Sequence, residues 1–129
     1  MELYGDWKVK SIAAIKNGDF VYLTENEVTE DEDYQDYGFF FKCIFRVSPL
    51  QIEALYKPTQ EELDEGFDVE FPMTKEGYGL IETYAAEVRE DGYYYASGEL
   101  SDDEPIYKKA EINENGEFLL NNVFVLTKI

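Results

Sequence analysis

The chain has 129 residues and no histidine. A Ser-His or Cys-His catalytic pair therefore cannot form, and neither can a histidine-containing metal site or a haem held by a proximal histidine. There is a single cysteine, Cys43, so no disulfide can form within the chain. No apolar run approaches the ~20 residues of a membrane-spanning helix. The sequence therefore predicts no catalytic residue, no metal site, no cofactor and no membrane span.

Basic residues are scarce. Eleven Lys and Arg stand against 29 Asp and Glu, which gives a net charge of −18. Such a charge repels nucleic-acid phosphates and anionic membrane surfaces, so we expect neither as a partner. It attracts a basic protein or a cation, although acidic residues also serve solubility alone. The N-terminus shows no basic leader, so we expect a cytoplasmic protein; a trimmed secreted form would look the same.

Aromatic residues, in contrast, are plentiful. The chain holds 11 Tyr and 9 Phe, and 44% of its residues are hydrophobic. This composition excludes a disordered chain of low hydrophobicity, and aromatic side chains favour strands. The length fits one domain over residues 1–129.

Three dipeptides punctuate the chain: Asn17-Gly18, Asp91-Gly92 and Asn115-Gly116. Such residues accept the positive φ that tight hairpin turns require, so each dipeptide is expected to join two antiparallel strands. From the alternation of apolar and polar residues we predict strands over residues 6–15, 20–24, 39–47, 51–57, 67–71, 78–90, 93–100, 106–112 and 117–128.

Residues 25–36 are acidic and are expected to form a loop or a solvated strand end. One helix of one or two turns is expected over residues 59–66, where Thr59 and Glu62 have the spacing of a capping box and Gly66 can end the helix. Consecutive hairpins leave few free edges when the sheet closes on itself. The predicted fold is therefore an all-β, antiparallel up-and-down barrel of about eight or nine strands with one short helix.

The face of the first strand is set by its lysines. Because Lys8, Lys10 and Lys16 mark the outer face, the residues of the opposite phase are expected inside the barrel. These are Trp7, Val9, Ser11, Ala13 and Ile15.

Gly5-Asp6-Trp7, followed by this strand, resembles the Gly-x-Trp opening of the lipocalin and fatty-acid-binding families. The resemblance implies a barrel in which Trp7 closes one end and the other end opens onto a ligand cavity. It also implies a basic side chain packed over this tryptophan, a role that Lys128 of the last strand can take. The Arg-x-Tyr arrangement that holds a fatty-acid carboxylate in those families is absent.

Two residues with reactive side chains fall on predicted inner faces. Cys43 shares its face with Phe41 and Phe45, where an inert buried thiol is expected rather than a nucleophile. Glu82 shares a face with Tyr84 and is expected to point into the barrel. A buried carboxylate is costly unless it is paired, so it often marks a binding site. The alternative is that Glu82 reaches water near a strand end or pairs with a tyrosine.

The inner faces together predict a ligand-binding site that is mostly apolar or aromatic and that contains no lysine or arginine. Its residues are Phe41, Cys43, Phe45, Ile52, Tyr56, Glu82, Tyr84, Tyr95 and Ser97. Such a lining suits a neutral or cationic apolar ligand, since a buried anion would face Glu82 without a counter-ion.

The acidic residues 30–36 lack the spacing of an EF-hand loop, so calcium binding is not expected there. Three function classes remain. The first is non-catalytic binding of a small, largely apolar ligand inside the barrel. The second is an acidic interaction module that binds a basic protein while side chains fill its interior. The third, an enzyme, has no motif in its support.

Overall fold

The computed structural model describes residues 3–129, and within this range it describes all side chains except those of residues 98–101. The elements, in chain order, are β1 (Gly5–Lys16), β2 (Asp19–Thr24), α1 (Glu25–Glu30), the 3₁₀ helix η1 (Glu32–Lys42), β3 (Cys43–Val47), β4 (Gln51–Tyr56), α2 (Gln60–Asp64), α3 (Phe67–Glu70), β5 (Gly79–Arg89), β6 (Gly92–Ser101), β7 (Glu104–Lys109), β8 (Phe118–Leu120) and β9 (Phe124–Lys128).

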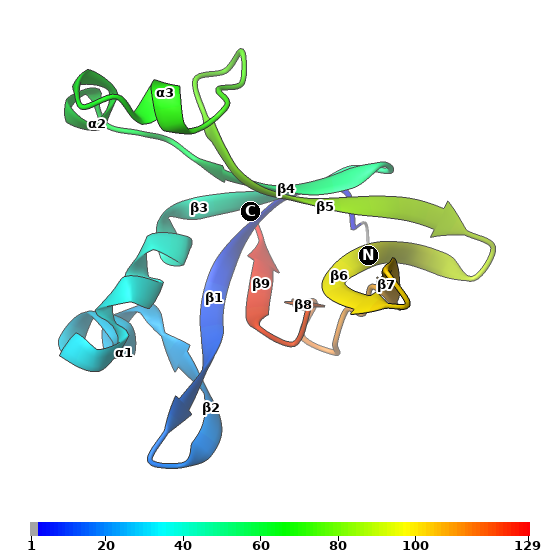
Figure 1. The fold of residues 1–129 in the computed structure, drawn as a ribbon. Helices are drawn as coiled ribbons and strands as arrows, with labels where there is room; N and C mark the ends of the chain where they lie inside the picture. The colour runs from blue at the N-terminus through cyan, green and yellow to red at the C-terminus, as the bar shows by residue number, and fades with distance from the viewer. Residues whose placement is uncertain (1–2) are drawn as a thin grey trace.

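One antiparallel sheet curls into a half-barrel (Figure 1). Its strand order is β7-β6-β5-β4-β3-β1-β9-β8, and β2 pairs with the distal half of β1 outside this path. The segment that follows β7 meets β8 at an isolated bridge between Ile112 and Phe118. The predicted all-β, antiparallel, barrel-like fold of eight or nine strands is confirmed. Over residues 3–129, no helix is long and apolar enough to cross a bilayer.

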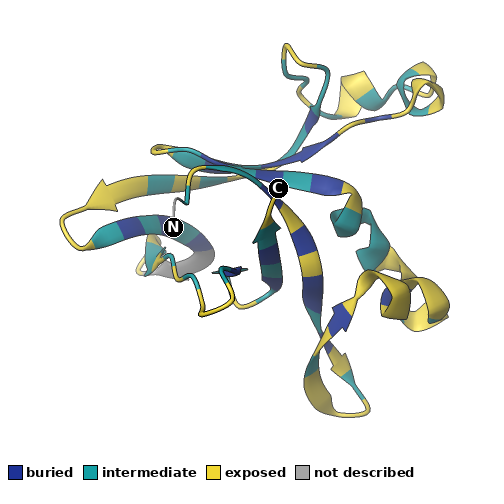
Figure 2. Cartoon of the chain, turned by 180° about the vertical axis from the view of Figure 1, so that it is seen from behind, coloured by how far each residue is buried: buried dark blue, intermediate teal, exposed yellow. Residues whose placement is uncertain are grey.

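The core lies on the concave side of the sheet. Trp7, Phe45, Phe118, Leu120 and Leu126 are fully buried there. Exposed residues gather on the helices and on the tip of the β1–β2 hairpin, whereas buried residues alternate along the strands (Figure 2). This alternation is what a sheet with one wet face requires.

Trp7 points into the core, as predicted, with no exposed surface. Its ring meets that of Phe118 edge-on at 5.7 Å between centroids, and its Nε1–H donates to the carbonyl of Leu3 at 2.8 Å. The ammonium of Lys128 lies 5.0 Å from the centroid of the Trp7 ring. The predicted contact between these two residues is therefore present.

The inner face of β1 changes phase at a β-bulge. The β1–β9 ladder pairs Val9 with Leu126 and Ser11 with Val125, so Lys10 is the extra residue. Beyond the bulge, Ile12 and Ala14 are buried, whereas Ile15 is 62% exposed. The prediction that Ala13 and Ile15 point inward is wrong, because it assumed an unbroken period of two.

Two of the three predicted hairpin turns join paired strands. Asn17-Gly18 links β1 to β2, with φ of 54° and 82°. The β5–β6 turn is formed by Glu90 and Asp91, one residue before the predicted Asp91-Gly92, because Arg89 pairs with Gly92. The strand predicted over residues 117–128 is instead broken by Asn121-Asn122, whose φ values of 55° and 58° form a turn between β8 and β9. Two consecutive asparagines accept this conformation almost as glycine does.

The helical content was underpredicted. Residues 25–30 form α1 rather than a loop, with a capping box between Thr24 and Glu27. Residues 39–42, predicted as strand, are the last turn of η1, and residues 67–70, also predicted as strand, form α3 behind Gly66 at φ 98°. Phe39, Phe40 and Phe41 are all half-buried in η1, so the apparent alternation of Phe39 and Phe41 did not report a strand face. The predicted helix at Thr59 is confirmed as α2, including its capping box.

Candidate functional site

Eight of the nine predicted site residues lie together on the concave face of β3–β6. The ladders pair Cys43 with Tyr56, Ile52 with Tyr84, and Ala54 with Glu82, and directly opposed residues share a face. Tyr84 and Tyr95 touch edge-on at 6.5 Å between centroids, which joins β6 to this set. Phe41 is the exception, since it lies half-buried in η1 and not on a strand.

Four of these residues belong to the packed interior. Phe45 and Ile52 have no exposed surface, and Phe45 packs against the ring of Phe124 at 5.1 Å. The Tyr95 hydroxyl accepts a hydrogen bond from the backbone N–H of Asn121 at 2.7 Å. The Ser97 hydroxyl donates to the carbonyl of Ile106 at 3.0 Å. Side chains thus occupy this part of the interior, and its polar groups have partners.

The wall of the half-barrel has a gap beside β5. β6 pairs with β5 only through residues 86–89, and from Ala96 onward it pairs with β7 alone (Figure 1). The start of β5 also has a neighbour on the side that faces away from β4. Residues 72–73 cover it as far as Leu80, whose N–H donates to the carbonyl of Pro72. Within the described chain, residues 81–85 therefore have β4 on one side and no strand on the other. We call residues 81–85 the wall gap.

Glu82 lies in the wall gap. Its side chain is exposed, which corrects the prediction that it is buried inside the barrel. The face of β5 on which Glu82 lies was predicted correctly, because Glu82 stands directly opposite the buried Ala54. Glu82 is exposed because β6 does not pair with β5 at this position. The Tyr84 hydroxyl donates to Glu82 Oε2 at 2.7 Å, as the alternative interpretation expected.

Tyr84 is a fixed hydrogen-bond donor toward this carboxylate. Burial raises the pKa of its phenol, and the hydrogen bond to Glu82 raises it further. The phenol therefore keeps its proton at neutral pH. Together the two side chains present an oriented carboxylate above the small side chain of Ala54.

Cys43 is a buried thiol, as predicted, with 2% of its surface exposed. Its Sγ–H points to the carbonyl of Phe39 at 3.6 Å. Burial, followed by the charge of Glu82, raises the pKa of Cys43 to about 12. The thiolate is therefore scarce at neutral pH, and nucleophilic chemistry is not supported at this position.

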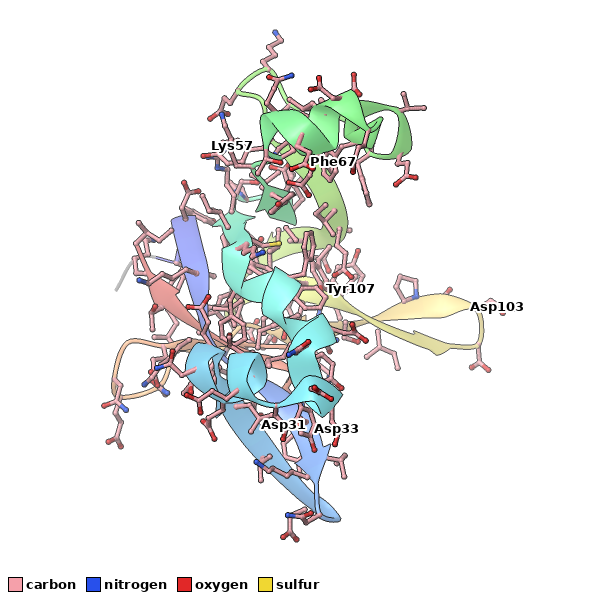
Figure 3. The ribbon with its side chains drawn as sticks, turned by 90° about the vertical axis from the view of Figure 1, so that its left-hand side faces the viewer. Asp31, Asp33, Lys57, Phe67, Asp103 and Tyr107 are labelled. Atoms are coloured by element: carbon pink, nitrogen blue, oxygen red, sulfur yellow. The ribbon has the colours of Figure 1, made fainter. Side chains whose placement is uncertain are left out.

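Tyr56 ties the concave face to the helices that follow β4. Its hydroxyl donates to Glu62 Oε1 at 2.6 Å, and this hydrogen bond, with burial, raises the pKa of Tyr56 to about 12. Phe39 of η1 and Phe67 of α3 flank its ring at 4.9 and 5.7 Å. Figure 3 shows Phe67 projecting from α3 at the upper end of the half-barrel. These rings form an aromatic rim next to Cys43.

A lysine also stands at the edge of the predicted set. Lys108 of β7 is directly opposite Tyr95, and both border a depression of about 270 Å³. The expectation that no lysine joins the set is therefore wrong at this position. β7 was predicted as a strand, but its register with β6 depends on a bulge between Ala96 and Leu100 that the sequence does not mark.

A larger depression, which the sequence did not predict, lies between α1 and η1. It measures about 570 Å³. Its lining residues are Glu25, Val28, Thr29, Gln35, Asp36, Gly38, Phe39 and Lys42. The signal that could have revealed α1 is the capping-box spacing of Thr24 and Glu27 ahead of Val28.

The acidic run at residues 30–36 contributes to the end of α1 and the start of η1. The carboxylate of Asp31 accepts a hydrogen bond from the N–H of Asp33 at 3.0 Å and so begins η1 (Figure 3). Across the part of the chain that the structure describes, no group of three Cys, Asp or Glu side chains is placed to hold a metal ion.

Similarity to known proteins adds nothing to the geometry described above, on which any proposed function therefore rests. No protein-family model matches the chain, and neither a curated protein nor a solved structure is significantly similar to it.

Proposed function

We propose that the protein binds, without catalysis, a small and largely apolar ligand that carries a positive charge. The ligand lies at the wall gap, and the carboxylate of Glu82 accepts its charged hydrogen-bond donor. The observation that carries the proposal is the Glu82–Tyr84 pair, an exposed carboxylate oriented by a neighbouring phenol at 2.7 Å.

The charge of Glu82 is available to a ligand. Within the described chain, no ion pair joins Glu82 to a lysine or an arginine. A charge-assisted hydrogen bond from a ligand ammonium would therefore be a gain rather than an exchange of partners. The half-buried side chains of Ile81 and Tyr84 pack against the core beside Glu82 and offer apolar surface. The Tyr84 ring adds a face for a cation.

The proposal differs in place from a ligand held at the barrel centre. Phe45, Ile52 and Trp7 fill that centre, so the ligand lies against the exposed side chains at the wall gap. The Gly-x-Trp opening and the packing of Lys128 over Trp7 support the lipocalin-like interpretation of the barrel.

Three fluorescent probes with the same dansyl group test the proposal: cationic dansylcadaverine, neutral dansylamide and anionic dansyl-undecanoic acid. Titration followed by dansyl emission is expected to give tightest binding for dansylcadaverine. Glu82→Gln should weaken the cationic probe about tenfold, the loss of one charge-assisted hydrogen bond, and leave the neutral probe unchanged.

Glu53→Gln is the matched control, because Glu53 is the residue next to Ala54 on β4 and its side chain lies on the opposite face. It removes the same charge and should leave all three affinities unchanged. Tightest binding by the anionic probe, or no binding by any probe, overturns the proposal. Equal weakening by Glu53→Gln assigns the effect to net charge rather than to Glu82.

A further inference from the structure

The free side of β2 is a second feature that lies apart from the wall gap. Strand edges of the described chain that lack a neighbour include residues 81–85 of β5 with the facing end of β6, the outer side of β7, and the outer side of β2. The outer side of β8 is covered by residues 111–112, through the Ile112–Phe118 bridge and the hydrogen bond from the Leu119 N–H to the Glu111 carbonyl. Uncovered edges invite pairing with another chain, and proteins block them with prolines, lysines or misplaced charges. Comparing the three edges shows which one is open.

Two of the edges carry blocking residues. The wall gap carries Glu82, a charge on the concave face. β7 carries Pro105, which lacks an N–H, and the lysines 108 and 109. Its hairpin with β6 extends away from the half-barrel to Asp103 (Figure 3). β2 reads Asp-Phe-Val-Tyr-Leu-Thr, with one charge at its start, no proline and no lysine. β2 is therefore the edge without protection.

We propose that β2 accepts an extended, basic segment of another protein as an additional strand. The site is independent of the proposed ligand site at Glu82.

The backbone groups of Phe20 and Tyr22 face the open side. The pair Lys16–Asp19 closes the two-residue turn, and hydrogen-bonded and non-hydrogen-bonded pairs alternate from there. Ile15 and Ala13 stand opposite Phe20 and Tyr22. Their backbone groups bond to partners outside β2, which confirms that these two pairs are the non-hydrogen-bonded ones. The Ile15 carbonyl accepts from the Tyr34 hydroxyl at 2.9 Å, and the Ala13 N–H donates to Val123 at 2.7 Å.

The N–H and C=O groups of Phe20 and Tyr22 therefore form no hydrogen bonds with β1. In the described structure no other hydrogen bond engages these four groups, so they are free to pair with an added strand.

The side chains beside this edge are apolar and exposed. Phe20 is 60% exposed and Tyr22 is 38% exposed, and their rings touch edge-on at 5.4 Å. Ile15, paired with Phe20, is 62% exposed on the same face. The hairpin projects from the half-barrel (Figure 1), so the surface is accessible. An added strand would cover apolar area on this face as well as pair with the backbone.

Charge selects a basic partner over a second copy of the chain. Each chain carries a net charge of −18, so two copies repel one another. Next to β2, the first turn of α1 brings Glu25 and Glu27, and Asp19 begins the strand. Thr24 donates to Glu27 from both its N–H and its hydroxyl, which lowers the pKa of Glu27 and keeps it charged. Alternating lysines on an added strand would meet these carboxylates.

The probe is an eight-residue peptide of alternating valine and lysine, labelled with a fluorophore and followed by fluorescence anisotropy. A second peptide carries N-methyl groups on two adjacent central residues, which block both edges of a strand without changing charge or sequence. We expect the first peptide to bind and the methylated peptide to bind about tenfold more weakly or not at all, since several backbone hydrogen bonds are lost.

Protein variants place the binding on β2. Phe20→Pro removes the N–H that faces the open side and should weaken the peptide about tenfold. Phe20→Thr, the matched control, removes the same ring but keeps the N–H and should weaken it less. Glu82→Gln should leave the peptide affinity unchanged. If Phe20→Pro fails to fold, the methylated peptide still decides the question, because it needs no variant.

Equal binding of both peptides would show attraction by charge alone and overturn the proposal, as would no binding of either. A wild-type dimer in sedimentation equilibrium that Phe20→Pro converts to a monomer would assign the edge to a second copy and also overturn it.

Discussion

Lys128 and Trp7 are directly opposite one another on β9 and β1, and the lysine ammonium lies 5.0 Å from the centroid of the indole ring. The same ammonium donates to the carbonyl of Tyr4. The indole N–H donates in turn to the carbonyl of Leu3. The two side chains thus fasten the segment before β1 to the first and last strands of the half-barrel, although 121 positions separate them in the chain.

Trp7→Ala is expected to lower the free energy of unfolding by ~3–5 kcal/mol, as for other large buried aromatic side chains. The ring has no exposed surface and packs on Phe118, so its removal leaves a cavity at the centre of the core. Urea denaturation measures the change. Val69→Ala, at a position that is 86% exposed, serves as the control and should change stability by less than ~0.5 kcal/mol. A cost for Trp7→Ala below ~1 kcal/mol would place Trp7 outside the core.

The ion pair between Lys10 and Glu117 predicts a pH dependence of stability. The hydrogen bond from Lys10, followed by that from Asn113, lowers the pKa of Glu117 in the folded state. A lowered folded-state pKa contributes stability above the ordinary pKa of 4.5 and loses it as the pH falls through the lowered value. Glu117→Gln should therefore lose stability at pH 7 and show a flatter decline in acid than the wild type.

Urea midpoints between pH 7 and pH 3 test this prediction. Glu114→Gln is the control, because Glu114 is an exposed residue of the same turn. A parallel decline in acid for wild type and Glu117→Gln would contradict the role given to Glu117.

Patterns of neighbouring residues predicted the local structure well. Asn17-Gly18 defined the β1–β2 hairpin because its two residues must adopt positive φ. Thr59 and Glu62 defined the start of α2 in the same way. The lysines of β1 fixed the inward direction of Trp7. Each of these signals acts over a few residues, so the sequence alone contains it.

Two of the features that failed depend on contacts distant in the sequence, whereas α1 and the Asn121-Asn122 turn have local signals that were not used. The bulge at Lys10 lies in the ladder between β1 and β9, where Val9 and Ser11 pair with the consecutive residues Leu126 and Val125. The two strands are more than 100 residues apart in the chain. The exposure of Glu82 depends on where β6 leaves β5, which the alternation within β5 does not encode. The shared face of β3–β6 was therefore predicted except at Phe41, whereas the unpaired edge of residues 81–85 was not.

Cys43 should be unreactive in the folded protein. Burial raises the pKa of its thiol to about 12, so little thiolate is present at neutral pH. Only 2% of the Cys43 surface is exposed, so a reagent in solution cannot reach the sulfur. At pH 8, Ellman's reagent is expected to react slowly with the native protein and rapidly, at one thiol per chain, after unfolding in urea. Rapid reaction of the native protein would show that the η1–β3 junction opens and exposes Cys43.

The turn between β8 and β9 offers a test of backbone conformation alone. Asn122 has φ 58° and an exposed side chain, so a substitution there changes the strain of the turn with little change in packing. Asn122→Ala should lower the free energy of unfolding by about 1 kcal/mol, since alanine pays a steric cost in the left-handed region. Asn122→Gly should be neutral or slightly stabilising, because glycine adopts this φ freely. Thermal and urea denaturation of the pair would measure the difference, and equal stability of the two variants would mean that β8 and β9 are joined by a different turn.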